Sequence, residues 1–132
     1  MRKILVVLVA AALLAAMAAP AALAINKACT DNSCSGTSGA DNLRERRGKG
    51  STDSISGKGG KDTLRAETYG SDRDVLKGGP GNDTLNARDD DSRDTLEGGP
   101  GIDSCKGDPK DSFRGCETQV ELVTGRVVER VR

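Results

Sequence analysis

The sequence contains a nine-residue pattern that returns along most of its length. GGPGNDTLN, residues 78–86, reappears as GGPGIDSCK, residues 98–106. Aligning the chain on Asp-x-apolar adds five further nine-residue units, and an incomplete eighth unit that ends at Phe113. These five are GTSGADNLR (36–44), GKGSTDSIS (48–56), GKGGKDTLR (57–65), YGSDRDVLK (69–77) and DDDSRDTLE (89–97). Such repetition predicts that equivalent segments stack on one another.

The spacing of the sixth-position aspartates sets the size of the structural repeat. Taken in alternation, these aspartates form two series with spacings of 20 or 21 residues. The first series is Asp41, Asp62, Asp83 and Asp103, and the second is Asp53, Asp74 and Asp94. Each coil should therefore hold about twenty residues, with two turns and two very short strands. We expect an all-β fold, a parallel β-solenoid of about four coils over residues 36–117.

Each predicted strand sends one apolar side chain inward, because successive side chains of a strand point to opposite faces. The inward residues are Leu43, Leu64, Leu85 and Cys105 on one sheet, and Ile55, Leu76, Leu96 and Phe113 on the other. This thin core agrees with the composition, since only about 23% of residues 25–132 are apolar. Burial alone cannot offset the conformational entropy of such a chain, so a metal, disulfides or strict repetition must add stability.

The glycine-rich turns have the composition of a cation site. Glycine gives the backbone access to positive φ and lets carbonyl oxygens converge without a Cβ between them. Pro80 and Pro100 stand at the third turn position, where a fixed φ and a missing N–H are tolerated. One carboxylate per turn, stacked on an equivalent turn, completes a cage of oxygens. Such a cage suits Ca²⁺ better than Mg²⁺, because calcium accepts six to eight oxygens in loose geometry.

The two full units resemble the Gly-Gly-x-Gly-x-Asp-x-apolar-x nonapeptide of the RTX, or haemolysin-type, calcium-binding repeats, and the resemblance extends from residue 36 to about residue 114. It implies a parallel β-roll that holds Ca²⁺ between successive turns through turn carbonyls and sixth-position aspartates. The implied carboxylate ligands are Asp41, Asp62, Asp83 and Asp103. The implied turn glycines are Gly36, Gly39, Gly57, Gly60, Gly78, Gly79, Gly81, Gly98, Gly99 and Gly101.

The second series of turns departs from this pattern. GKGSTD, YGSDRD and DDDSRD lack the glycine positions, and extra residues precede each of them. Asp53, Asp74 and Asp94 persist there, with Asp72 and residues 89–91 nearby. Either these carboxylates bind calcium directly, or they belong to solvated turns in which aspartate bonds its own backbone.

The first 24 residues are expected to be an export signal. Arg2 and Lys3 precede an apolar run, and Ala22-Leu23-Ala24 fits a small-x-small cleavage site. A transmembrane anchor is the alternative, because the apolar run is about long enough to span a bilayer. With the signal removed, we expect an extracellular protein that has no membrane span.

Export favours disulfides over metal binding for the four cysteines. Local pairs, Cys29–Cys34 and Cys105–Cys116, are expected, because the first and fourth coils are about 14 Å apart and one bridge cannot span that distance. Residues 25–35 would then form an N-terminal disulfide cap. The valine-rich segment 120–131 suggests a strand pair within a C-terminal β cap or tail, residues 118–132, with a helix as the other interpretation.

Several function classes are disfavoured by the composition. The chain has no histidine, so Ser-His-Asp and Cys-His catalysis are excluded, and no enzyme is expected. Residues 25–132 carry 18 Lys and Arg against 20 Asp and Glu, so no basic excess indicates nucleic acid as a partner.

The expected function is calcium binding coupled to folding. The alternative is a calcium-rigidified adhesive or glycan-binding module that uses an outward column of side chains, either Asn42, Thr63, Thr84 and Ser104 or Arg44, Arg65, Asn86 and Lys106.

Overall fold

A computed structural model describes residues 23–30, 32–46, 52–67, 72–90, 93–123 and 126–132. Nearly all of the expected export signal, residues 1–22, lies outside the described residues. Twelve strands are assigned in the described part of the chain. They are β1 (Asn26–Cys29), β2 (Ser33–Ser35), β3 (Asn42–Glu45), β4 (Ser54–Ser56), β5 (Thr63–Arg65), β6 (Val75–Lys77), β7 (Thr84–Ala87), β8 (Thr95–Glu97), β9 (Ser104–Gly107), β10 (Ser112–Arg114), β11 (Thr118–Val123) and β12 (Arg126–Val131). Nowhere in these residues does a helix occur that is long and apolar enough to cross a membrane.

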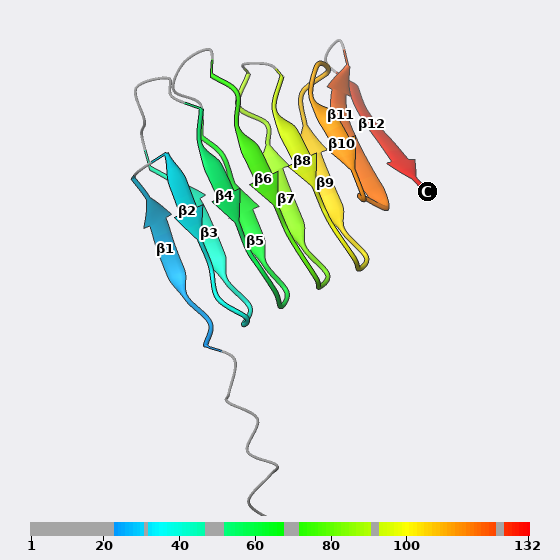
Figure 1. The fold of residues 1–132 in the computed structure, drawn as a ribbon. Coiled ribbons are helices and arrows are strands. Elements are labelled where there is room, and N and C mark those ends of the chain that lie inside the picture. Colours follow the sequence, from blue (N-terminus) through cyan, green and yellow to red (C-terminus); the bar gives the residue numbers. More distant parts are fainter. Residues whose placement is uncertain (1–22, 31, 47–51, 68–71, 91–92, 124–125) are drawn as a thin grey trace, which may run out of the picture.

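The strands form two sheets that face each other along a parallel β-solenoid of about four coils (Figure 1). One sheet has the order β1-β3-β5-β7-β9-β11-β12 and the other β10-β8-β6-β4-β2. Neighbouring strands are parallel, except that β12 returns antiparallel to β11. The expected β-roll is thereby confirmed, and the C-terminal segment is a strand pair rather than a helix.

The core is a double column of single side chains. In the larger sheet Leu43 is aligned with Leu64, Leu64 with Leu85, and Leu85 with Cys105. In the smaller sheet Cys34 precedes the expected column of Ile55, Leu76, Leu96 and Phe113. All of these side chains are buried except Phe113, which is partly buried against the others. Strands of three or four residues suffice, because each coil has to place only one apolar side chain inward from each sheet.

Disulfides close both ends of this column. Cys29 at the end of β1 is bonded to Cys34 in β2, and Cys105 in β9 is bonded to Cys116 before β11. Both pairings are local along the chain. They tie the terminal strands to the first and last coils, where the core has a neighbour on one side only.

The connections between the sheets lie along two edges (Figure 1). We call the edge formed by turns 36–41, 57–62, 78–83 and 98–103 the glycine edge. The opposite edge, where the chain passes from β3 to β4, from β5 to β6 and from β7 to β8, we call the loop edge. Sixth-position aspartates immediately precede the strands at both edges, so the acids of each series stack in one row.

Candidate metal centre

The aspartates of the glycine edge form a hydrogen-bonded ladder between coils. Oδ1 of Asp62 accepts the backbone N–H of Asp41 at 2.8 Å, and Oδ1 of Asp83 accepts that of Asp62 at 2.8 Å. Oδ1 of Asp103 accepts the N–H of Asp83 at 2.7 Å. One oxygen of each carboxylate is therefore held by the preceding coil, which orients the second oxygen.

That second oxygen is buried and without a partner in three of the four turns. Oδ2 of Asp62, Asp83 and Asp103 has no hydrogen-bond partner in the structure, although all three residues are at most 2% exposed. An unpaired buried polar atom is costly, and an unpaired buried charge is costlier still. These oxygens are the strongest indication that the edge takes a cation.

Glycine carbonyls converge on the same places. A Cβ built at Gly57 would lie 2.8 Å from the carbonyl oxygen of Gly78 and closer still to Oδ2 of Asp62. A Cβ built at Gly78 would likewise meet the carbonyl oxygen of Gly98, at 2.6 Å, and Oδ2 of Asp83. The first-position glycine thus leaves room for a carboxylate oxygen and a carbonyl oxygen from the next coil. This donor set fits Ca²⁺, which prefers oxygen ligands and accepts backbone carbonyls.

The remaining turn glycines allow the backbone to take conformations that other residues rarely adopt. Positive φ angles occur at Gly60, Gly79, Gly81, Gly99 and Gly101. Gly36 and Gly98 take the same place as Gly57, against the carboxylates of Asp41 and Asp103, and the carbonyl group of Gly39 packs against Gly60. Apart from Gly39, which is the neighbour that Gly60 contacts, the glycines singled out in the sequence stand where a side chain would meet the turn of their own or a neighbouring coil.

The two ends of the aspartate row differ from its middle. Oδ2 of Asp41 accepts the backbone N–H of Thr37, and Oδ1 accepts that of Ile25 at 2.8 Å. Although burial acts to raise it, these bonds and the charge of Lys58 hold the pKa of Asp41 below its ordinary value. At the other end Glu117 takes the place of an aspartate, because its carboxylate accepts the N–H of Asp103 at 2.7 Å.

Burial makes ionisation of the middle aspartates unfavourable when no cation is bound. It raises the pKa of Asp62 and Asp103 above the ordinary value, although backbone hydrogen bonds act in the opposite direction. At Asp83 burial, together with the charges of Asp62 and Asp103, raises the pKa to about 6. A bound divalent cation would remove this penalty, since it favours the charged form of each carboxylate.

The loop edge repeats the same ladder without the glycines. Asp53 donates its N–H to Oδ1 of Asp74 at 2.8 Å, and Asp74 donates its own to Oδ1 of Asp94 at 2.7 Å. All three aspartates are buried, and Oδ2 of Asp74 and Asp94 has no partner. Burial, reinforced by neighbouring acids, raises the pKa of Asp74 to about 7 and that of Asp94 to about 8. These side chains are buried and accept hydrogen bonds from the preceding coil. They therefore do not belong to solvated turns in which each aspartate bonds its own backbone.

One residue at the loop edge, Glu45, lies where the sequence had not indicated a ligand. Glu45 is the last residue of β3 and is buried beside Asp74 and Asp72, of which Asp72 was already among the acids noted near this series of turns. Glu45 belongs to an arginine-rich stretch, RERR, and has no counterpart in the other units. Because side chains alternate along a strand, the inward Leu43 and the outward Arg44 predict that Glu45 points inward, and this is the one sequence signal for its position.

A family model described as the RTX calcium-binding nonapeptide repeat matches the chain in four copies, over residues 47–67 and 68–105. No curated protein and no solved structure matches the chain.

Proposed function

This chain carries the RTX calcium-binding nonapeptide repeat, and from that premise we propose that it is an exported protein whose β-roll folds when it binds calcium. RTX repeats bind Ca²⁺, so calcium binding by the roll follows from the family. Export, the coupling of binding to folding, and the individual ligands are the parts that we add.

One observation carries the proposal: the row of unpartnered Oδ2 atoms at Asp62, Asp83 and Asp103. We assign these three carboxylates as ligands, each with a glycine carbonyl of the following coil. Asp41 stands at the end of the row, and its carboxylate already accepts hydrogen bonds from Thr37 and Ile25. We therefore assign it a smaller contribution to calcium binding. Bound calcium supplies positive charge that offsets the burial of the acids.

Coupling to folding is supported by the balance between core and charge. The buried apolar residues form two columns one side chain wide, whereas ten aspartates and one glutamate are also buried among the residues that the structure describes. Burial of so many carboxylates without counter-charges opposes folding. Since a preformed site does not exist in the unfolded chain, the binding free energy of the ion would become folding free energy.

Export is supported by the N-terminal segment and the disulfides. We propose that residues 1–24 are removed as a signal, that residues 25–35 cap the first coil, and that residues 118–132 cap the last. Both disulfides are of the kind that persists in oxidising compartments. The intact mass of the protein recovered from the culture medium tests this, because a mature chain should begin at Ile25 with all four cysteines oxidised.

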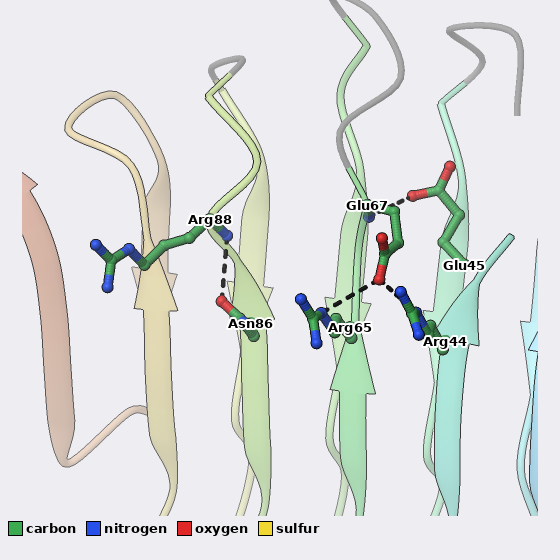
Figure 2. A network of polar contacts seen from close by, with 6 residues as sticks. All are labelled: Arg44, Glu45, Arg65, Glu67, Asn86 and Arg88. Atoms are coloured by element: carbon green, nitrogen blue, oxygen red, sulfur yellow. Dashed lines mark hydrogen bonds and ion pairs between the residues drawn. The ribbon is translucent and has the colours of Figure 1, made fainter. Parts of the chain in front are cut away.

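The adhesive alternative is not favoured by the exposed face. In its basic column, Arg44 and Arg65 both pair with Glu67, so part of the positive charge is neutralised within the molecule (Figure 2). RTX repeats are structural and calcium-binding rather than catalytic, and we propose no enzymatic activity for the chain.

Calcium titration of the mature protein, followed by far-UV circular dichroism, tests the proposal. The calcium-free chain should be largely unfolded and should gain β-structure with a midpoint of roughly 10⁻⁴–10⁻³ M, the range of extracellular modules. Asp83→Asn keeps an oxygen for the N–H of Asp62 but removes the charge, so it should raise the midpoint about tenfold or more. Glu129→Gln, on exposed β12, is the matched control and should leave the midpoint unchanged. A β-rich spectrum that chelator does not alter would contradict the coupling.

A further inference from the structure

Three acidic side chains from successive coils meet at the loop edge. Glu45 ends β3, whereas Asp72 and Asp74 precede β6. One carboxylate oxygen from each lies within 4.8 Å of the other two, and the residues are 1%, 5% and 1% exposed. The cluster shares no residue with the glycine edge.

Four oxygens of this cluster lack a hydrogen-bond partner: Oε1 of Glu45, both carboxylate oxygens of Asp72, and Oδ2 of Asp74. The other oxygens are anchored. Oε2 of Glu45 accepts the backbone N–H of Glu67 at 2.8 Å, and Oδ1 of Asp74 accepts that of Asp53 at 2.8 Å. Asp72 is the most informative member, because a buried carboxylate with both oxygens unpaired is among the costliest groups that a protein can hold without a ligand.

Packing does not explain a glutamate at position 45. Carried one residue beyond the paired strands, the register aligns this position with Ala66 and Ala87, and Ala87 is paired with Gly107, so the following coils place a methyl group or a hydrogen there. Glu45 instead reaches toward the loop edge, where the N–H of Glu67 holds one of its oxygens (Figure 2).

The ion pairs found near this cluster, in the part of the chain that the structure describes, are made with Glu67 rather than with the three clustered carboxylates. The nearby Arg44 and Arg65 pair with the side chain of Glu67, which lies on the outer side (Figure 2). Asp53 is also buried and adds to the acids of this region: its charge helps burial to raise the pKa of Glu45, and the pKa of Asp53 is itself raised by burial and by the charge of Asp72, although a hydrogen bond with Glu45 acts in the opposite direction. The local charge is therefore strongly negative, with a dense set of free oxygens.

We propose that Glu45, Asp72 and Asp74 form a second kind of calcium site, built from side-chain carboxylates rather than from glycine-turn carbonyls. Calcium is the cation of choice because it accepts carboxylates in one- or two-oxygen contact and in irregular geometry, whereas Mg²⁺ demands a near-ideal octahedron. The site joins the end of β3 to the segment before β6. It therefore fastens successive coils at the edge where the connections are longest.

The number of calcium ions bound by the mature chain, measured by native mass spectrometry at saturating calcium, tests the site. Glu45→Ala places at 45 the residue that Ala66 and Ala87 supply in the same column, and Glu45→Gln retains an oxygen for the N–H of Glu67. Each variant should bind one ion fewer than the unaltered chain. Asp83→Asn should lose binding at the glycine edge and retain the ion that depends on Glu45, which separates this site from the proposed function.

Glu97→Gln is the matched control, because Glu97 pairs with Lys77 and Arg114 away from the cluster. It should bind as many ions as the unaltered chain. An unchanged ion count in the Glu45 variants would overturn the site, and protons would then be the neutralising species. A measurement that needs no variant is the anomalous scattering of calcium in crystals of the unaltered protein. A peak between Glu45, Asp72 and Asp74 is expected, and its absence at saturating calcium would also overturn the proposal.

Discussion

At Gly60 the backbone adopts a φ of 112°, and its α-carbon packs against the carbonyl group of Gly39 in the preceding coil. Glycine recurs at this turn position in every coil, at residues 39, 60, 81 and 101. Gly59, its neighbour, has no such constraint, because the nearest atom to an added Cβ would be 3.8 Å away. The turn therefore requires glycine at one of two adjacent residues only.

We predict that Gly60→Ala lowers the free energy of unfolding, measured in saturating calcium, by about 2 kcal/mol or more. A Cβ there would lie 2.5 Å from both the carbonyl carbon and the carbonyl oxygen of Gly39, and positive φ adds roughly 1–2 kcal/mol of strain for an L-residue. Gly59→Ala should change the free energy of unfolding by less than about 1 kcal/mol, because the backbone conformation of Gly59 is compatible with a side chain. Urea denaturation of the two variants measures the difference, and equal losses would show that the turn is not limited by backbone conformation.

The short strands are stable as a set because each is paired on both sides, and the terminal elements lack one neighbour. β1 and β2 begin the roll and are joined by Cys29–Cys34, which has a sequence separation of 5 residues. At the other end Cys105–Cys116 has a separation of 11 residues and connects a core position in β9 to the segment that leads into β11. The second bridge therefore closes a longer loop, one that contains the whole of β10.

Removing the C-terminal bridge by Cys105→Ala with Cys116→Ala should destabilise the calcium-loaded roll by about 3 kcal/mol, against about 2 kcal/mol for Cys29→Ala with Cys34→Ala. The difference follows from loop length, because a longer closed loop restricts the unfolded chain more. Urea denaturation in saturating calcium measures both. The opposite order would mean that the N-terminal cap holds the roll together more than loop length indicates.

Over the whole molecule, two rows of buried acids flank a narrow apolar core. In the absence of a cation, three acids of these rows have raised pKa values in the folded state, about 6 for Asp83, about 7 for Asp74 and about 8 for Asp94, with burial as the principal cause in each. Protons and calcium are therefore competing ways to neutralise the same edges.

We predict that the calcium-free chain gains β-structure when the pH is lowered from 8 to 5. Between the ordinary aspartate pKa of about 4 and these raised values, the folded state binds more protons than the unfolded state. Its stability therefore rises as the pH falls through this window and is lost as the pH rises. The calcium midpoint should move the other way and tighten with increasing pH, because ligands must be deprotonated. Circular dichroism of decalcified protein across this range checks both, and loss of β-structure at pH 5 would contradict the first.

The β-roll could be predicted from the amino-acid sequence alone, because the aspartate spacing of 20 or 21 residues defines a coil and the Asp-x-apolar unit defines what each strand buries. The columns of Leu64 and Leu76 follow from that period, and the local cysteine pairs follow from the distance between coils together with the export signal. The glycine-edge candidates could be named for the same reason, since ligands that repeat with the coil are visible as a repeat.

Only the tertiary structure brought Glu45 to Asp72 and Asp74, and Glu117 into the aspartate row. No other unit has a glutamate at the position of Glu45, which lies 27 residues before Asp72. Glu117 follows Asp103 by 14 residues, so neither residue fits the period of 20 or 21. The path of the longer connections and of the last incomplete coil decides which side chains meet there. Contacts that repeat in every coil can be predicted from the spacing of residues in the sequence. Contacts made only once depend on how the irregular segments fold in three dimensions.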